Sequence, residues 1–89
     1  MIELLYFTGK RCGVCQVLKP KLLEAVRENF PEVKIRVVDV EVEPELAGQS
    51  MVFTLPVVIL KLDDKEMFRF ARSFSVHQVL EKVKQLSGE

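Results

Sequence analysis

The sequence lacks a net charge, a long apolar run and a basic N-terminal leader. Thirteen Lys and Arg residues balance thirteen Asp and Glu residues, so general attraction to nucleic acid or to an anionic membrane has no net charge to act on. No apolar run approaches the roughly 20 residues of a membrane-spanning helix. Residues 1–7 have neither the basic part nor the long apolar part of a signal peptide. We therefore predict a cytoplasmic protein whose partners include neither nucleic acid nor membrane.

Cysteine and histidine are scarce: there are two cysteines and one histidine. Stable structural disulfides are rare in the cytoplasm, so Cys12 and Cys15 indicate catalysis or metal binding. A closed zinc site takes four ligands, and His77, the one imidazole, lies far along the chain. A cluster shared between two chains would need four thiolates. We predict no metal and no cofactor, and a thiol-ligated metal or cluster carrier remains the less favoured alternative.

The remaining composition predicts one α/β domain over residues 1–89, because 48% of the residues are apolar and suffice for a core. Apolar and β-branched runs predict strands, and helical spacing with end signals predicts helices. Pro44 is expected to begin a helix, and Ser75 with Gln78 forms a capping box. The strands are expected at residues 2–7, 33–42, 57–62 and 66–71, and the helices at 14–29, 44–49 and 76–86. The element order is βαβαββα.

The two cysteines stand in the motif Cys12-Gly13-Val14-Cys15, between the first strand and the first helix. Two thiols at this spacing can close a small disulfide ring and reopen it. The start of a helix offers unpaired N–H groups and the positive end of the helix dipole, and both stabilise a thiolate. This spacing near a βαβ pattern is typical of redox chemistry.

Four features resemble the thioredoxin-like superfamily, and the resemblance covers essentially the whole chain. They are the cysteine motif, Pro20 five residues after it, Asp39 at the end of the second strand, and Leu55-Pro56 at the opening of the third. The resemblance implies a thioredoxin-like fold with a four-stranded mixed sheet in the order 2-1-3-4, flanked by helices. It also implies that the third strand runs antiparallel to the first.

The resemblance implies a thiol–disulfide oxidoreductase, most simply a disulfide reductase. Cys12 looks like the exposed nucleophile and Cys15 like the buried resolving thiol, and their redox-active disulfide needs no further cofactor. It implies a disulfide-containing protein or small molecule as substrate, a thiol or a reductase as electron donor, and a cis Leu55–Pro56 bond. We expect a monomer. The residues expected to contact the substrate are Arg11, Gly13, Val14, Thr54, Leu55, Pro56 and Arg72.

The positions that depart from the pattern of the family include three that bear on the expected site. Arg11 stands where a tryptophan usually precedes the first cysteine, and Arg72 stands where a glycine precedes the last helix. Tyr6 stands in place of a buried acid, and it is the best candidate to replace that acid through its hydroxyl or a water. Lys10, Arg11 and Arg72 are expected near Cys12, where they would lower its pKa and favour an acidic substrate.

Several side chains have a simpler interpretation than a role in catalysis. His77 is expected to be an exposed helix residue, and Asp39 a strand-end or capping residue. Phe53 is expected either to form an apolar docking rim with Val14 and Leu55 or, like Met51, to be part of the core. A solvated acidic edge is expected at Glu41, Glu43 and Glu45.

One alternative function belongs to a different class. The chain would then be a binding module that senses redox state or delivers electrons to one dedicated partner. A general reductase is expected to reduce unrelated disulfides, whereas a dedicated module is not.

Overall fold

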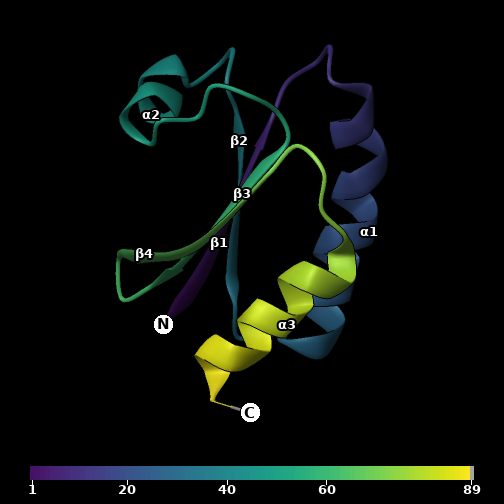
Figure 1. The fold of residues 1–89 in the computed structure, drawn as a ribbon, viewed down its shortest axis with the longest axis vertical. Coiled ribbons are helices and arrows are strands. Elements are labelled where there is room, and N and C mark those ends of the chain that lie inside the picture. Colours follow the sequence, from purple (N-terminus) through teal and green to yellow (C-terminus); the bar gives the residue numbers. More distant parts are fainter. Residues whose placement is uncertain (89) are drawn as a thin grey trace.

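The computed structural model describes residues 1–88. Its elements alternate in the predicted order βαβαββα (Figure 1). No helix of this part of the chain has both the length and the apolar character needed to cross a membrane. The strands are β1 (Ile2–Thr8), β2 (Lys34–Asp39), β3 (Val57–Leu62) and β4 (Lys65–Ala71), and the helices are α1 (Gly13–Asn29), α2 (Pro44–Gln49) and α3 (Val76–Ser87).

The four strands form one mixed sheet in the order β2-β1-β3-β4. Strand β1 pairs in parallel with β2 and antiparallel with β3, and β4 returns antiparallel to β3. The predicted strand order and directions are therefore confirmed. Because β1 and β3 are the inner strands, they are apolar along most of their length, as a strand covered on both faces must be.

Successive residues of β1 point to opposite faces and enter two separate cores. Leu4 and Tyr6 pack with α1 and α3 on one face. Leu5 and Phe7 pack with α2 residues such as Ala47 on the other face. Figure 1 shows the same arrangement, with α1 and α3 together on one side of the sheet and α2 on the other. The end of β1 is thus held from both faces where the chain turns into the cysteine motif.

Strand β2 is shorter than the β-branched run that predicted it. It ends at Asp39, not at residue 42. The Asp39 carboxylate accepts the N–H of Glu41 at 2.9 Å. The backbone carbonyl of Asp39 accepts the N–H groups of Val42 and Glu43 at 3.0 and 2.9 Å. These bonds close a turn, so Val42 is 72% exposed and does not continue the strand as predicted. The capping interpretation of Asp39 is confirmed.

The predicted end signals of the other elements hold. The Oγ of Ser75 accepts the N–H of Gln78 at 3.1 Å, and the side chain of Gln78 accepts the N–H of Ser75 at 2.8 Å. Helix α2 begins at Pro44 as predicted. The β3–β4 turn contains only Asp63 and Asp64, both with positive φ, so β4 begins one residue earlier than predicted.

Arg69 of β4 ties the end of α2 to the edge of the sheet. Its guanidinium donates to the carbonyls of Ser50 and Met51 at 2.6 and 3.1 Å and to the carboxylate of Glu66 at 2.9 Å. The segment that follows α2 leads directly to Pro56. The sheet edge therefore anchors the start of the segment that carries Leu55 and Pro56.

Candidate active site

The two cysteines form a disulfide at the first turn of α1. Cys12 is the N-cap residue, with extended backbone and a half-buried side chain, whereas Cys15 is fully buried. The backbone N–H of Cys15 donates to the Sγ of Cys12 at 3.2 Å. The helix start therefore directs a hydrogen-bond donor at the more accessible sulfur.

Gly9 fastens the loop that precedes the motif. Its carbonyl accepts the N–H of Cys12 at 3.2 Å and the side-chain amide of Gln16 at 3.1 Å. A Cβ atom at Gly9 would lie 3.0 Å from the Cδ1 of Leu55. The glycine therefore lets the Leu55–Pro56 segment pack closely beside the cysteine loop.

A cleft of about 500 Å³ opens beside Cys12. It brings together most of the residues predicted to contact a substrate, including Val14, Leu55 and Pro56, and the Leu55–Pro56 peptide bond is cis. A larger hollow of about 800 Å³ lies between α1 and Val37 and contains neither cysteine, so we assign the chemistry to the smaller cleft. Its lining is Cys12, Gly13, Val14, Leu18, Leu55, Pro56, Arg72, Ser73 and Phe74.

Three of these lining residues, Leu18, Ser73 and Phe74, were not predicted. Leu18 belongs to the apolar stripe of α1, which helical spacing assigns to the core. Ser73 and Phe74 follow Arg72, and the N–H of Arg72 donates to the carbonyl of Pro56 at 2.9 Å. This bond places the β4–α3 connection against the cleft, and the proximity of these residues to Arg72 was the only signal in the sequence.

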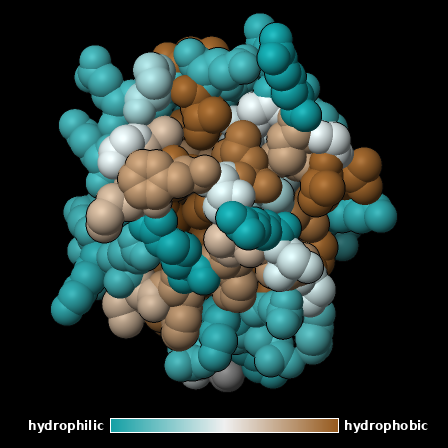
Figure 2. Space-filling view, turned by 45° about the horizontal axis from the view of Figure 1, so that its top comes forward, coloured by the Kyte–Doolittle hydropathy of each residue, from teal (hydrophilic) through white to brown (hydrophobic). Residues whose placement is uncertain are grey.

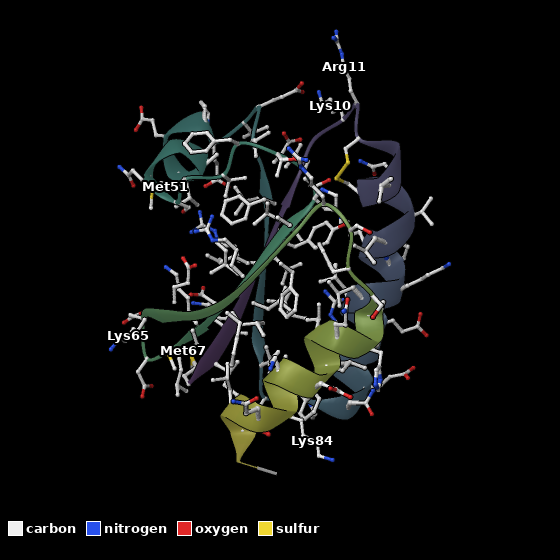
Figure 3. The ribbon with its side chains drawn as sticks, viewed as in Figure 1. Lys10, Arg11, Met51, Lys65, Met67 and Lys84 are labelled. Carbon is white, nitrogen blue, oxygen red and sulfur yellow. A yellow bond between two sulfur atoms is a disulfide. The ribbon has the colours of Figure 1, made fainter. Side chains whose placement is uncertain are left out.

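Three residues that were expected near the substrate, Arg11, Phe53 and Thr54, do not line the cleft. Arg11 is exposed and does not line it, and Figure 3 shows its side chain extending outward from the loop beside Lys10. Phe53 does not line it either, and the alternative core assignment is wrong because Phe53 is 85% exposed and Met51 66% exposed. Thr54 is not a lining residue, but its Oγ1 accepts the Nε–H of Arg72 at 3.2 Å.

Tyr6 lies directly under the cysteine turn. Its side chain is fully buried, and its hydroxyl donates to the carbonyl of Cys15 at 2.8 Å. Burial raises the pKa of Tyr6 from 10.0 to about 12, because removal from water disfavours the charged phenolate. Tyr6 therefore keeps its proton at neutral pH. Its hydrogen bond to the carbonyl of Cys15 holds the first turn of α1 in place.

The remaining polar candidates stay outside the cleft. His77 is exposed on α3 and pairs with Glu81 at 2.8 Å, as expected for a surface helix residue. Glu41 and Glu45 are exposed, and Glu43 pairs with Arg36. Within residues 1–88, no three His, Cys, Asp or Glu side chains gather closely enough to hold a metal ion.

Comparison with known proteins assigns the chain to a family. A family model described as Thioredoxin matches residues 2–85. The chain belongs to the thioredoxin family. The thioredoxin-like protein YdfQ of Bacillus subtilis is 33% identical to this chain over 82 residues. The match covers 92% of this chain and 72% of YdfQ. The thioredoxin of Chlamydia trachomatis is 39% identical over 68 residues, covering 76% of this chain and 66% of that protein.

A solved structure supports the same assignment. Thioredoxin 1 from Thermosipho africanus matches with a TM-score of 0.83 and 34% identity, covering 98% of this chain and 99% of that one. The thioredoxin family, the fold and the adjacent cysteine pair together identify a thiol–disulfide oxidoreductase. In general terms, membership of the thioredoxin family implies disulfide substrates and a reductase partner.

Proposed function

We propose that this protein is a cytoplasmic disulfide reductase in which Cys12 attacks the substrate and Cys15 resolves the intermediate. The different settings of the two sulfurs carry the proposal. Cys12 lines the cleft at the start of α1 and accepts the N–H of Cys15, whereas Cys15 is fully buried. A substrate disulfide can reach only the first sulfur directly, so the second is suited to intramolecular attack.

The proposed cycle starts from the reduced dithiol. The Cys12 thiolate is stabilised by the N–H of Cys15 and by the helix dipole, and no acidic residue in the first turn opposes it. It attacks one substrate sulfur to form a mixed disulfide, and the other substrate sulfur leaves as a thiol. Cys15 then loses its proton and attacks Cys12, releasing the second substrate thiol. Two electrons pass to the substrate, and an external dithiol or a reductase restores the dithiol.

The backbone beside the cleft supports docking of an extended substrate. Among the described residues, neither the N–H nor the carbonyl of Leu55 forms a hydrogen bond, and this residue lines the cleft next to Cys12. An extended peptide can therefore bond to it as an added strand does. Val14 and Leu55 both add apolar surface to the lining of the cleft.

The exposed apolar residues around α2 favour one second candidate, a module dedicated to one partner. Val42 precedes α2, and Met51 and Phe53 follow it, all at least 66% exposed. These side chains do not line the cleft, so a docking partner that covers them would explain their exposure. Reduction of several unrelated disulfides at similar rates would contradict this candidate and support the general reductase.

The experiment that tests the proposal combines redox titration with two cysteine variants. We expect a reversible two-electron transition within about −220 to −320 mV, the range of cytosolic poise. Cys15→Ser is expected to accumulate a mixed disulfide with substrate, detected by mass spectrometry, and Cys12→Ser to accumulate none. The absence of a reversible transition, or accumulation by Cys12→Ser instead, would contradict the assignment of roles.

A further inference from the structure

Arg72 has an unusual backbone conformation for a residue with a side chain. Its φ is +64°, in the left-handed region that favours glycine. The N–H of Ser73 donates to the carbonyl of Ala71 at 2.8 Å, which closes a three-residue turn with Arg72 at its centre. Turns of this kind with positive φ are rare and strained. Strain of this sort is concentrated at functional sites, so the side chain itself requires an explanation.

The guanidinium of Arg72 is oriented but not neutralised. Its Nε donates to the Oγ1 of Thr54 at 3.2 Å, and its two terminal nitrogens have no acceptor within residues 1–88. Two other arginines differ, because Arg36 and Arg69 form ion pairs with glutamates. The terminal N–H groups of Arg72 therefore remain available to a ligand.

Arg72 is also the only charged residue among those that line the cleft beside Cys12. No carboxylate in that lining competes for it. Lys10 and Arg11 lie on the loop just before the cysteines and add positive charge at the same end of the molecule (Figure 3). Figure 2 shows this end turned forward, with apolar surface divided among hydrophilic side chains. An anionic group that approaches the sulfur therefore meets uncompensated positive charge.

We infer that Arg72, oriented by Thr54, selects peptide disulfides that carry a carboxylate side chain beside the reacting cysteine. This inference rests on the proposed reductase function and names its substrate class. The planar fork of a guanidinium can bind both oxygens of a carboxylate, and such charge-assisted bonds are among the stronger hydrogen bonds in proteins. The peptide backbone would lie along Leu55 while its carboxylate reaches Arg72.

The test compares two peptide disulfides that differ only in Glu or Gln next to one cysteine. The wild-type protein is expected to show a kcat/KM for the Glu peptide about tenfold higher, the ratio that one charge-assisted bond supplies. Arg72→Gly and Arg72→Gln are both expected to bring this ratio close to one. Arg27→Gln is the matched control, because it removes a positive charge from the last turn of α1, outside the cleft. It is expected to leave the ratio unchanged.

Thermal stability separates recognition from a structural role. Arg72→Gly relieves a left-handed backbone, so its melting temperature is expected to be no lower than that of the wild type, although selectivity is lost. Equal rates for the two peptides in the wild type, or an unchanged ratio in both Arg72 variants, would overturn the inference and leave the reductase function intact. If the wild type reduces neither peptide, both the inference and the proposed reductase function are overturned.

Oxidised glutathione separates a peptide from a small anionic disulfide as the source of the carboxylate. The Arg72 variants are expected to lose activity toward the Glu peptide at least as strongly as toward oxidised glutathione. A loss confined to oxidised glutathione would overturn the peptide as the substrate class.

Discussion

The hydroxyl of Tyr6 bonds to the cysteine turn, and its burial makes the stability of the folded protein depend on pH. It is the only tyrosine in a chain without tryptophan, and it is fully buried against the carbonyl of Cys15. Its pKa is raised to about 12 from 10.0 by burial. Between these two pH values the folded protein keeps a proton that the unfolded chain has lost, so the folded state becomes less stable as pH rises.

We therefore predict a stability loss from Tyr6 that is absent below pH 10 and complete above pH 12. It is expected to reach about 2–3 kcal/mol, since each pKa unit corresponds to about 1.4 kcal/mol. Denaturant unfolding of the oxidised protein at a series of pH values measures it, and ultraviolet absorbance of the single phenolate follows the titration. Tyr6→Phe lacks the hydroxyl and is expected to be about 1 kcal/mol less stable at neutral pH. An equally steep alkaline loss in that variant would contradict the prediction.

Single residues also show where sequence reasoning about the site succeeds and where it stops. The motif and the proline pattern identify Cys12, Cys15 and Leu55-Pro56, because their chemistry depends on residue type and spacing. The directions of Arg11 and Phe53 depend on how the loops turn, and no periodicity encodes that. Arg72 was expected near Cys12 and lines the cleft, but its residue type does not indicate the left-handed backbone that places it there.

At the scale of elements, α2 and β4 are joined through Arg69. The same guanidinium bonds two carbonyls at the end of α2 and the carboxylate of Glu66. The Glu66 pKa is lowered, first by its hydrogen bond from Arg69. A lowered carboxyl pKa means that the contribution of this pair to stability is present above the unfolded pKa and is lost as pH falls. The anchor of α2 is thus expected to weaken in acid.

We predict that Arg69→Met destabilises the protein by about 1–2 kcal/mol, because several hydrogen bonds are lost at a partly exposed site. Hydrogen exchange is expected to accelerate first in α2 and the segment after it. Glu66→Gln keeps the bonds to Ser50 and Met51 and is expected to have a smaller effect. Faster exchange spread evenly over the sheet, with α2 no more affected than β1, would show that Arg69 is not a local anchor.

The elements themselves were largely predictable, because apolar periodicity and end signals act locally. The apolar runs of β1 and β3, Pro44 and the Ser75–Gln78 capping box place their elements correctly. The end of β2 was wrong because the β-branched run continues to Val42 while the Asp39 side chain closes a turn. This local hydrogen bond outweighs the strand propensity of residues 40–42.

At the scale of the whole molecule, we expect the fold not to depend on the disulfide. Apolar cores on both faces of the sheet hold the strands and helices, whereas Cys12 and Cys15 are only three positions apart. A ring this small removes little freedom from the unfolded chain. We expect a redox protein of this kind to remain folded in both states, so that only the site changes during a cycle.

We predict that the reduced protein is folded and at most about 2 kcal/mol less stable than the oxidised one, the loop-entropy value for so short a ring. For a chain of this size the difference corresponds to roughly 10 °C in melting temperature. Paired thermal melts with and without a dithiol reductant measure it, and Cys12→Ser with Cys15→Ser provides a permanently reduced reference. Loss of cooperative melting on reduction would contradict the prediction.

The strand order also bears on whether copies of the chain associate through the edges of the sheet. Strands β2 and β4 lie at the two edges of the sheet, and each begins with an exposed lysine, Lys34 and Lys65. An open edge is a template for pairing with another copy, and charged side chains on short edge strands discourage such pairing. The chain is therefore expected to stay dispersed as separate molecules in concentrated solution, and fibril growth from either edge is disfavoured.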